Sequence, residues 1–179
     1  MLKAETTALL VIDVQGKLAH SVFNKDALFD NTRRLVQGAR LLDLPIVWIE
    51  QYPQGLGPTI PEVSDLIDQP HALSKTTFSC CGEASIVKTL EQLGRQQLLV
   101  CGIEAHVCVY QSVMDLLERG YDVELIADAI SSRREENKEL GIRKMLRAGA
   151  QLSGTEMCLF ELVKDAASPK FRAMLELVK

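Results

Sequence analysis

Residues 7–14 read TALLVIDV, a run of aliphatic side chains that ends near a single carboxylate, Asp13. Three further aliphatic runs follow: PIVWIE at 45–50, QLLVC at 97–101 and DVELIA at 122–127. Short runs of branched aliphatic residues are typical of parallel strands whose two faces are both covered by helices. The stretch 7–14 therefore predicts the first strand of a covered parallel sheet.

Amphipathic stretches alternate with these runs, as βαβ units require. Long helices are predicted where apolar residues recur at helical spacing: 25–43, 84–93, 106–119 and 135–148. Shorter elements are predicted as a helical turn at 62–67, a strand at 151–153, a helix capped by Thr155 and a last helix opened by Pro169. The pattern predicts an α/β fold with three layers and a doubly wound, mainly parallel sheet. No repeat or linker divides the chain, so residues 1–179 are expected to form one domain.

The composition excludes several classes of partner. The formal net charge is −4, which gives nucleic acid no long-range attraction. No apolar stretch approaches the roughly 20 residues of a membrane helix, and the start of the chain lacks a signal-peptide pattern. The five cysteines are an odd number, which argues against a disulfide framework. We expect a cytoplasmic protein with reduced cysteines that acts on a small molecule, without nucleic-acid or membrane partners.

Ligands of doubly wound sheets bind beyond the carboxyl ends of the strands, and two reactive side chains are expected there. Asp13 ends an apolar strand, where a carboxylate needs a partner; it is either a turn residue or a general base. Cys108 lies in the predicted first turn of a helix, where backbone N–H groups and the helix dipole lower a thiol pKa. It is either a nucleophile or a small buried apolar residue.

Two further features are ambiguous when taken alone. Lys75, in LSKTTFS, is an isolated lysine, and such residues usually lie on the surface. Its interest depends on whether the fold brings it near Asp13 and Cys108. The turn at 102–104 either presents two backbone N–H groups as an oxyanion hole or simply reverses the chain.

Three segments together resemble the catalytic segments of the isochorismatase-like cysteine hydrolases, a group that includes nicotinamidases and N-carbamoylsarcosine amidase. They are TALLVIDVQ at 7–15, SKTTFS at 74–79 and LLVCGIEAHVCV at 98–109. The chain is most similar to isochorismatase-domain proteins of unassigned substrate. The resemblance implies Asp13 as general base, Lys75 as its cationic partner and Cys108 as nucleophile. It also implies a cis peptide bond between Ile103 and Glu104, and an oxyanion hole formed by the backbone N–H groups of Glu104 and Cys108.

The resemblance thus implies a cysteine hydrolase that cleaves a small amide-like (C–N) or related acyl substrate through a thioester. Nicotinamidases carry an Asp-x-His metal motif after the second strand, whereas this chain has Glu50-Gln51-Tyr52, with His71 as the nearest imidazole. One Glu and one His make a thin ligand set, so we expect no metal and no cofactor. True isochorismatases lack the nucleophilic cysteine, and Cys108 argues against their reaction.

Four residues are weaker candidates for substrate binding. Gln15 either points into the site or ties down its loop, and Phe23, Tyr52 and Phe78 either form an apolar wall or pack locally.

Two other functions remain open: a binding or scaffold module on the same fold, and a thiol redox sensor that pairs Cys108 with Cys80 or Cys81. The resemblance also implies a homo-oligomer, for which the apolar stretch 171–178 offers a contact surface.

Overall fold

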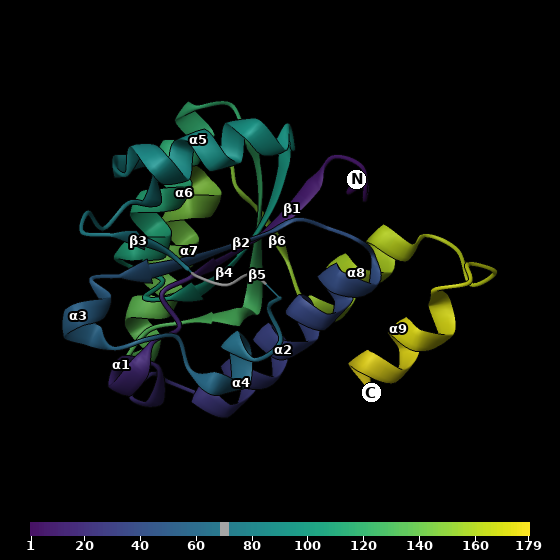
Figure 1. Ribbon diagram of the computed structural model, residues 1–179, viewed down its shortest axis with the longest axis horizontal. Helices are drawn as coiled ribbons and strands as arrows, with labels where there is room; N and C mark the ends of the chain where they lie inside the picture. The colour runs from purple at the N-terminus through teal and green to yellow at the C-terminus, as the bar shows by residue number, and fades with distance from the viewer. Residues whose placement is uncertain (69–71) are drawn as a thin grey trace.

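The computed structural model describes residues 1–68 and 72–179, and within them the centre of the fold is a parallel sheet (Figure 1). Its strands are β1 (Thr7–Ile12), β2 (Ile46–Gln51), β3 (Leu73–Lys75), β4 (Gln97–Ile103), β5 (Asp122–Ser131) and β6 (Gln151–Ser153). They are ordered β3-β2-β1-β4-β5-β6, and every neighbouring pair is parallel. This arrangement confirms the predicted α/β fold.

Helices cover both faces of the sheet, which gives three layers (Figure 1). The helices are α1 (Gly16–His20), α2 (Lys25–Leu41), α3 (Pro53–Leu56), α4 (Pro61–Ser64), α5 (Ala84–Leu93), α6 (Cys108–Glu118), α7 (Glu135–Arg147), α8 (Thr155–Val163) and α9 (Phe171–Val178), with a 3₁₀ turn η1 (Cys80–Gly82). Successive side chains of β1 point to opposite faces of the sheet and so belong to two separate hydrophobic cores. Leu9 and Val11 pack with residues of α2, α8 and α9, while Leu10 and Ile12 pack with residues of α5, α6 and α7.

The structure corrects several predicted boundaries. β3 was not anticipated, because three residues without an aliphatic run carry no strand pattern; it pairs with β2, with Lys75 opposite Gln51. Thr155 is the first residue of α8 and not its cap; its N–H and hydroxyl both donate to Asp128 Oδ1, each at 2.9 Å. The last helix begins at Phe171, two residues after Pro169.

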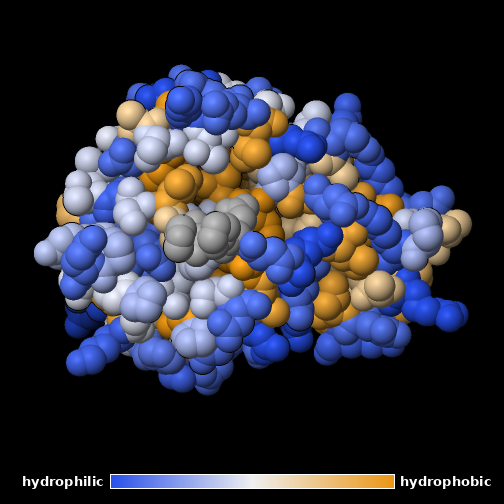
Figure 2. Space-filling view, in the orientation of Figure 1, coloured by the Kyte–Doolittle hydropathy of each residue, from blue (hydrophilic) through white to orange (hydrophobic). Residues whose placement is uncertain are grey.

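The C-terminal helix α9 packs against α2 and α8 of its own chain. Met174 is fully buried, and the rings of Phe160 and Phe171 lie 6.0 Å apart at the contact between α8 and α9. Figure 2 shows apolar side chains where α9 lies against α2 and α8. Phe171, Leu177 and Val178 are only partly buried, so a contact of the stretch 171–178 with a neighbouring subunit stays a prediction.

One glycine allows β1 and β4 to approach each other closely. Gly102 in β4 has a φ of +121°, and a Cβ there would collide with the carbonyl oxygen of Ile12 in β1. The close approach aligns the carboxyl ends of β1 and β4, so that Asp13 and the turn after β4 lie at the same edge of the sheet. Among the described residues, no helix is long and apolar enough to cross a membrane.

Candidate active site

A buried ion pair lies at the carboxyl ends of β1 and β3. Lys75 Nζ is 2.7 Å from Asp13 Oδ2, and the two side chains are 0% and 2% exposed. Asp13 follows β1 with a positive φ of 54°, and its N–H donates to the carbonyl of Ile49 at 3.1 Å. Since an isolated buried charge is costly, each group depends on the other. The fold therefore brings together two residues that are 62 positions apart in the sequence.

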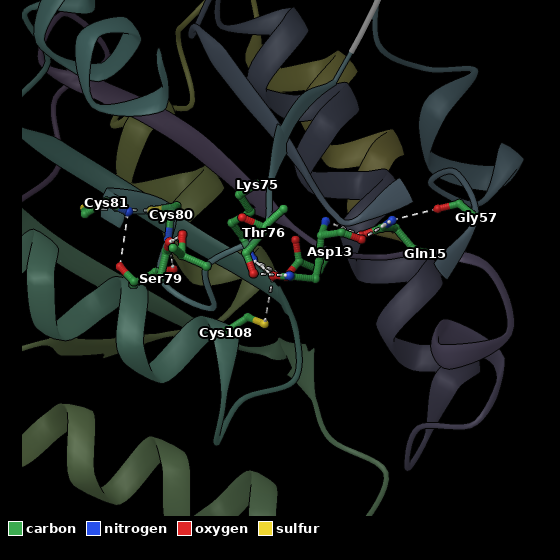
Figure 3. A network of polar contacts seen from close by, with 12 residues as sticks. Asp13, Gln15, Gly57, Lys75, Thr76, Ser79, Cys80, Cys81 and Cys108 are labelled. Atoms are coloured by element: carbon green, nitrogen blue, oxygen red, sulfur yellow. Dashed lines mark hydrogen bonds and ion pairs between the residues drawn. The ribbon is translucent and has the colours of Figure 1, made fainter. Parts of the chain in front are cut away.

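Gln51 links this ion pair to the sulfur of Cys108. Its side-chain Nε2 donates to the carbonyl of Thr76 at 2.8 Å, which leaves Oε1 facing the opposite way. Oε1 accepts from Lys75 Nζ at 2.6 Å and lies 3.9 Å from Cys108 Sγ. Figure 3 shows the Cys108 sulfur pointing from the start of α6 toward this group and Asp13. Gln51 ends β2, and only the pairing of β2 with β3 brings it beside Lys75. Sequence reasoning did not single out Gln51, because β3 was not anticipated.

The electrostatics of Cys108 differ from the expectation of a lowered thiol pKa. Burial, and then the negative charge of Asp13, raise the pKa of the Cys108 thiol to about 12, although Lys75 acts in the opposite direction. These effects outweigh the helix N-terminus. Burial also raises the pKa of Asp13, with Lys75 again opposing. The resting thiol therefore holds its proton, and the carboxylate beside it is a stronger base than an exposed one.

A small cavity opens above these groups. Its volume is about 120 Å³, and its polar lining comes from Asp13, Gln51, Glu104 and Cys108. The remaining wall is apolar: Leu18, Leu56, Phe78, Ile103 and Val107. Asp13 Oδ1 is buried and has no hydrogen-bond partner in the described structure. Asp13 and Cys108 therefore line the same small space, where a reacting group meets both residues.

The turn between β4 and α6 is held by the end of β5. The peptide bond between Ile103 and Glu104 is cis, and the N–H of Ala105 donates to the carbonyl of Ser131 at 2.8 Å. Glu104 Oε1 accepts from the backbone N–H and from Nε of Arg133, each at 3.0 Å. Cys108 is the first residue of α6, and the first N–H groups of a helix lack acceptors within it. The oxyanion hole at Glu104 and Cys108 stays a prediction.

The weaker candidates lie in different places. Gln15 is fully buried, and its Nε2 donates to the carbonyls of Gly57 at 2.7 Å and Gln51 at 3.2 Å, so its amide ties two loops together. Phe78 lines the cavity beside Cys108. Tyr52 is 54% exposed and does not appear in the lining, and Phe23 lines a separate hollow near Asp128.

The remaining candidate ligands and thiols are also placed. Glu50 Oε1 accepts from the N–H and hydroxyl of Thr59 at 2.6 and 2.9 Å, while His71 lies outside the described residues. No group of three or more His, Cys, Asp or Glu side chains is arranged for a metal in 1–68 and 72–179. Cys80 and Cys81 are free, with their sulfurs 4.0 Å apart. The contact with Cys80 lowers the pKa of Cys81.

Comparison with known proteins places the chain among relatives of similar length. Residues 7–157 match the model of the isochorismatase domain. Isochorismatase domain-containing protein 2 of Danio rerio is 38% identical over 178 residues, which cover 99% of this chain and 89% of the relative.

Two solved structures are similar in fold and sequence. The structure of a MAR1 ribonuclease from Caenorhabditis elegans has a TM-score of 0.93 and 36% identity, covering 99% of this chain and 91% of that one. YcaC from Pseudomonas aeruginosa, with hexane-2,5-diol and covalent acrylamide, has a TM-score of 0.92 and 27% identity, covering 98% and 90%.

Proposed function

The chain belongs to the isochorismatase-domain family, and on that premise we propose that it is a metal-independent cysteine hydrolase of a small amide-like or related acyl substrate. The observation that carries the proposal is that Asp13 and Cys108 line one cavity of about 120 Å³, while Lys75 pairs with Asp13 from behind that lining. An acid, an amine and a thiol in one small buried space are the groups that nucleophilic acyl transfer requires.

The first half of the reaction forms a thioester. Asp13 accepts the thiol proton as Cys108 Sγ attacks the substrate carbonyl carbon, and the ammonium of Lys75 stabilises the negative charge that builds up. The N–H groups of Glu104 and Cys108 donate to the tetrahedral oxyanion, a contribution of about 3–4 kcal/mol in comparable enzymes. The C–N bond then breaks, and the leaving amine takes the proton from Asp13.

The second half returns the enzyme to its starting state. Asp13 accepts a proton from water as the water oxygen attacks the thioester carbonyl. The C–S bond breaks, the acid product leaves, and the proton returns to the sulfur of Cys108. The raised pKa of Asp13 suits both halves, because a more basic carboxylate takes the proton of a weakly acidic thiol more readily.

The names of the structural neighbours bear on the substrate class. The structure of the Pseudomonas aeruginosa protein contains covalent acrylamide, which supports a reactive side chain in that protein. The Caenorhabditis elegans protein is called a ribonuclease. A cavity of about 120 Å³ and a net charge of −4 favour a small substrate over RNA for this chain.

Turnover of a panel tests the proposal. Small amides, carbamoyl compounds, activated esters and RNA are incubated with the native protein and with Cys108→Ala, and Cys81→Ala serves as the matched thiol control. We expect hydrolysis of a small acyl compound that Cys108→Ala abolishes and Cys81→Ala keeps. Intact mass spectrometry should find the acyl group on Cys108. Binding without turnover throughout would replace the proposal by a binding module, and RNA cleavage unaffected by Cys108→Ala would refute the cysteine mechanism.

We also propose that the protein is a homo-oligomer in the cytoplasm. Leu140, Leu152 and Met157 are 49%, 48% and 64% exposed, and we propose them as apolar contacts between subunits. The five free cysteines favour a reducing compartment. Light scattering that finds only a particle of 19.9 kDa would contradict the oligomer, and recovery in a secreted fraction would contradict the location.

A further inference from the structure

The cavity beside Cys108 offers a ligand no free positive charge. Its described lining contains no lysine, arginine or histidine. The ammonium of Lys75 lies behind the lining, where it donates to Asp13 Oδ2 at 2.7 Å and to Gln51 Oε1 at 2.6 Å. Lys75 is therefore committed to the protein's own acceptors.

An arginine beside the turn between β4 and α6 is paired as well. Arg133 follows β5, and its Nε lies 3.0 Å from Glu104 Oε1, which also accepts the Arg133 N–H. Glu104 is one of the lining residues, whereas Arg133 lies outside the lining with its side chain 62% exposed. Within the lining, a negatively charged ligand would thus meet the carboxylates of Asp13 and Glu104 and no cationic side chain.

The size and the wall of the cavity limit the acyl group. An apolar cavity of about 150 Å³ holds a molecule as large as benzene, whereas this one measures about 120 Å³. Leu18, Leu56 and Val107 contribute to an apolar wall that gains from a hydrocarbon partner. A carboxamide with an acyl chain of about five carbons has one non-hydrogen atom more than benzene, so it fills this cavity and extends into its open side.

The Asp13 carboxyl lines the cavity next to the Cys108 thiol, and each of the two groups shifts the pKa of the other. Asp13 Oδ1 is buried without a hydrogen bond in the described structure, and it belongs to a side chain that is 2% exposed. A buried acceptor of this kind gains from a donor. A primary carboxamide supplies N–H groups beside its carbonyl carbon, and a carboxylate supplies none.

We propose that the substrate is a small, uncharged carboxamide with an aliphatic acyl group of up to about five carbons, and that an acyl group bearing a carboxylate is rejected. This inference rests on the proposed hydrolase function and narrows it to one substrate class. The amide N–H of the substrate donates to Asp13 Oδ1, and its carbonyl carbon faces the sulfur of Cys108. Its hydrocarbon chain packs against the apolar wall around Leu18 and Val107. Hydrolysis releases ammonia and a short-chain carboxylic acid.

Two amides of the same shape separate charge from size. Isovaleramide carries an isopropyl group where malonamate carries a carboxylate, and the two molecules have equal numbers of non-hydrogen atoms. We expect kcat/KM for ammonia release to favour isovaleramide by at least about 100-fold, since malonamate would bury an unpaired charge. Comparable values, or a preference for malonamate, would overturn the inference while leaving the hydrolase function intact.

A designed cation provides the matched variant. Leu56 lines the cavity and is 38% exposed, so a longer polar side chain can be placed there without filling the core. Leu56→Arg should reduce the preference for isovaleramide by at least about tenfold, because the guanidinium can pair with malonamate, while the uncharged control Leu56→Gln should not. Equal effects of the two variants would contradict the charge argument.

Binding to Cys108→Ala keeps the inference testable if no turnover is found. Calorimetric titration of this variant with each amide reports recognition alone. Tighter binding of isovaleramide without any turnover by the native protein would support the selectivity of the cavity for uncharged amides and refute the hydrolase function. Equal or tighter binding of malonamate would refute the substrate class whatever the activity.

Discussion

Replacement of Lys75 by methionine should destabilise the protein in a pH-dependent way. The side chain is fully buried and donates to Asp13 and Gln51, and methionine has a similar length without the charge. Lys75→Met leaves a carboxylate buried with no counter-ion. Removal of one partner of a buried ion pair typically costs about 3–5 kcal/mol, a large part of the roughly 5–15 kcal/mol that stabilises a domain.

The pH dependence follows from the direction of the Asp13 pKa. Burial already raises that pKa above 3.8, so the folded protein binds the proton more tightly than the unfolded chain. The associated stability is complete below the unfolded pKa and is lost as the pH rises through the folded pKa. Lys75→Met removes the opposing charge and raises the folded pKa further. The deficit of the variant should therefore grow with pH, by up to about 1.4 kcal/mol per unit, until the new pKa is passed.

Urea unfolding followed by the fluorescence of Trp48, the single tryptophan, measures this effect. The native protein, Lys75→Met and the exposed control Lys88→Met are compared at pH 5 and pH 8, at one protein concentration. We expect a larger loss at pH 8 for Lys75→Met and little change for the control. Asp13→Asn combined with Lys75→Met should recover part of the loss, because no charge stays buried. A loss below about 1 kcal/mol that is equal at both pH values would refute the reasoning.

Three other changes have defined outcomes. Iodoacetamide should label Cys81 before Cys108, because Cys81 is partly exposed and has a lowered pKa. Peptide mapping should show that the labelling of Cys108 accelerates about tenfold per pH unit between pH 7 and 9. A plateau in that range would contradict the raised pKa of Cys108. Gly102→Ala, which adds a Cβ against the neighbouring strand, should lower the urea midpoint more than Gly120→Ala, which has a positive φ but open space, and equal losses would contradict the packing argument. Gln51→Leu removes the acceptor shared by Lys75 and Cys108 and should reduce kcat/KM for the substrate found in the panel by about 10–100-fold, whereas unchanged kinetics would exclude a positioning role.

The sequence was sufficient for most of the sheet, because aliphatic runs report burial on both faces directly. The stretches 7–14, 45–50, 97–101 and 122–127 each contain most of a strand. β3 gave no such signal, since a short edge strand is defined by its pairing with β2 and not by its composition. Without β3, nothing in the sequence places Lys75 beside Asp13 except the resemblance to a family.

The sequence indicated which residues form the site better than it indicated their protonation and hydrogen bonding. A position in the first turn of a helix favours a low thiol pKa for Cys108, yet burial and the charge of Asp13 reverse that preference. Those terms depend on distances that the sequence does not contain. Gln51 was missed for the same reason, because its amide gains significance only from the carbonyl of Thr76, which fixes its orientation.

The place of Lys75 on the outermost strand has a consequence for the order in which structure is lost. β3 spans three residues and has a single neighbour in the sheet, whereas β1 lies between two strands at its centre. Backbone amide hydrogens of short edge strands exchange with solvent through local openings, which need less free energy than complete unfolding. Each opening of β3 draws the ammonium away from the carboxylate while the central strands persist. We therefore expect mild denaturant to inactivate the protein before the two hydrophobic cores unfold. The activity should return on dilution without refolding of the whole domain.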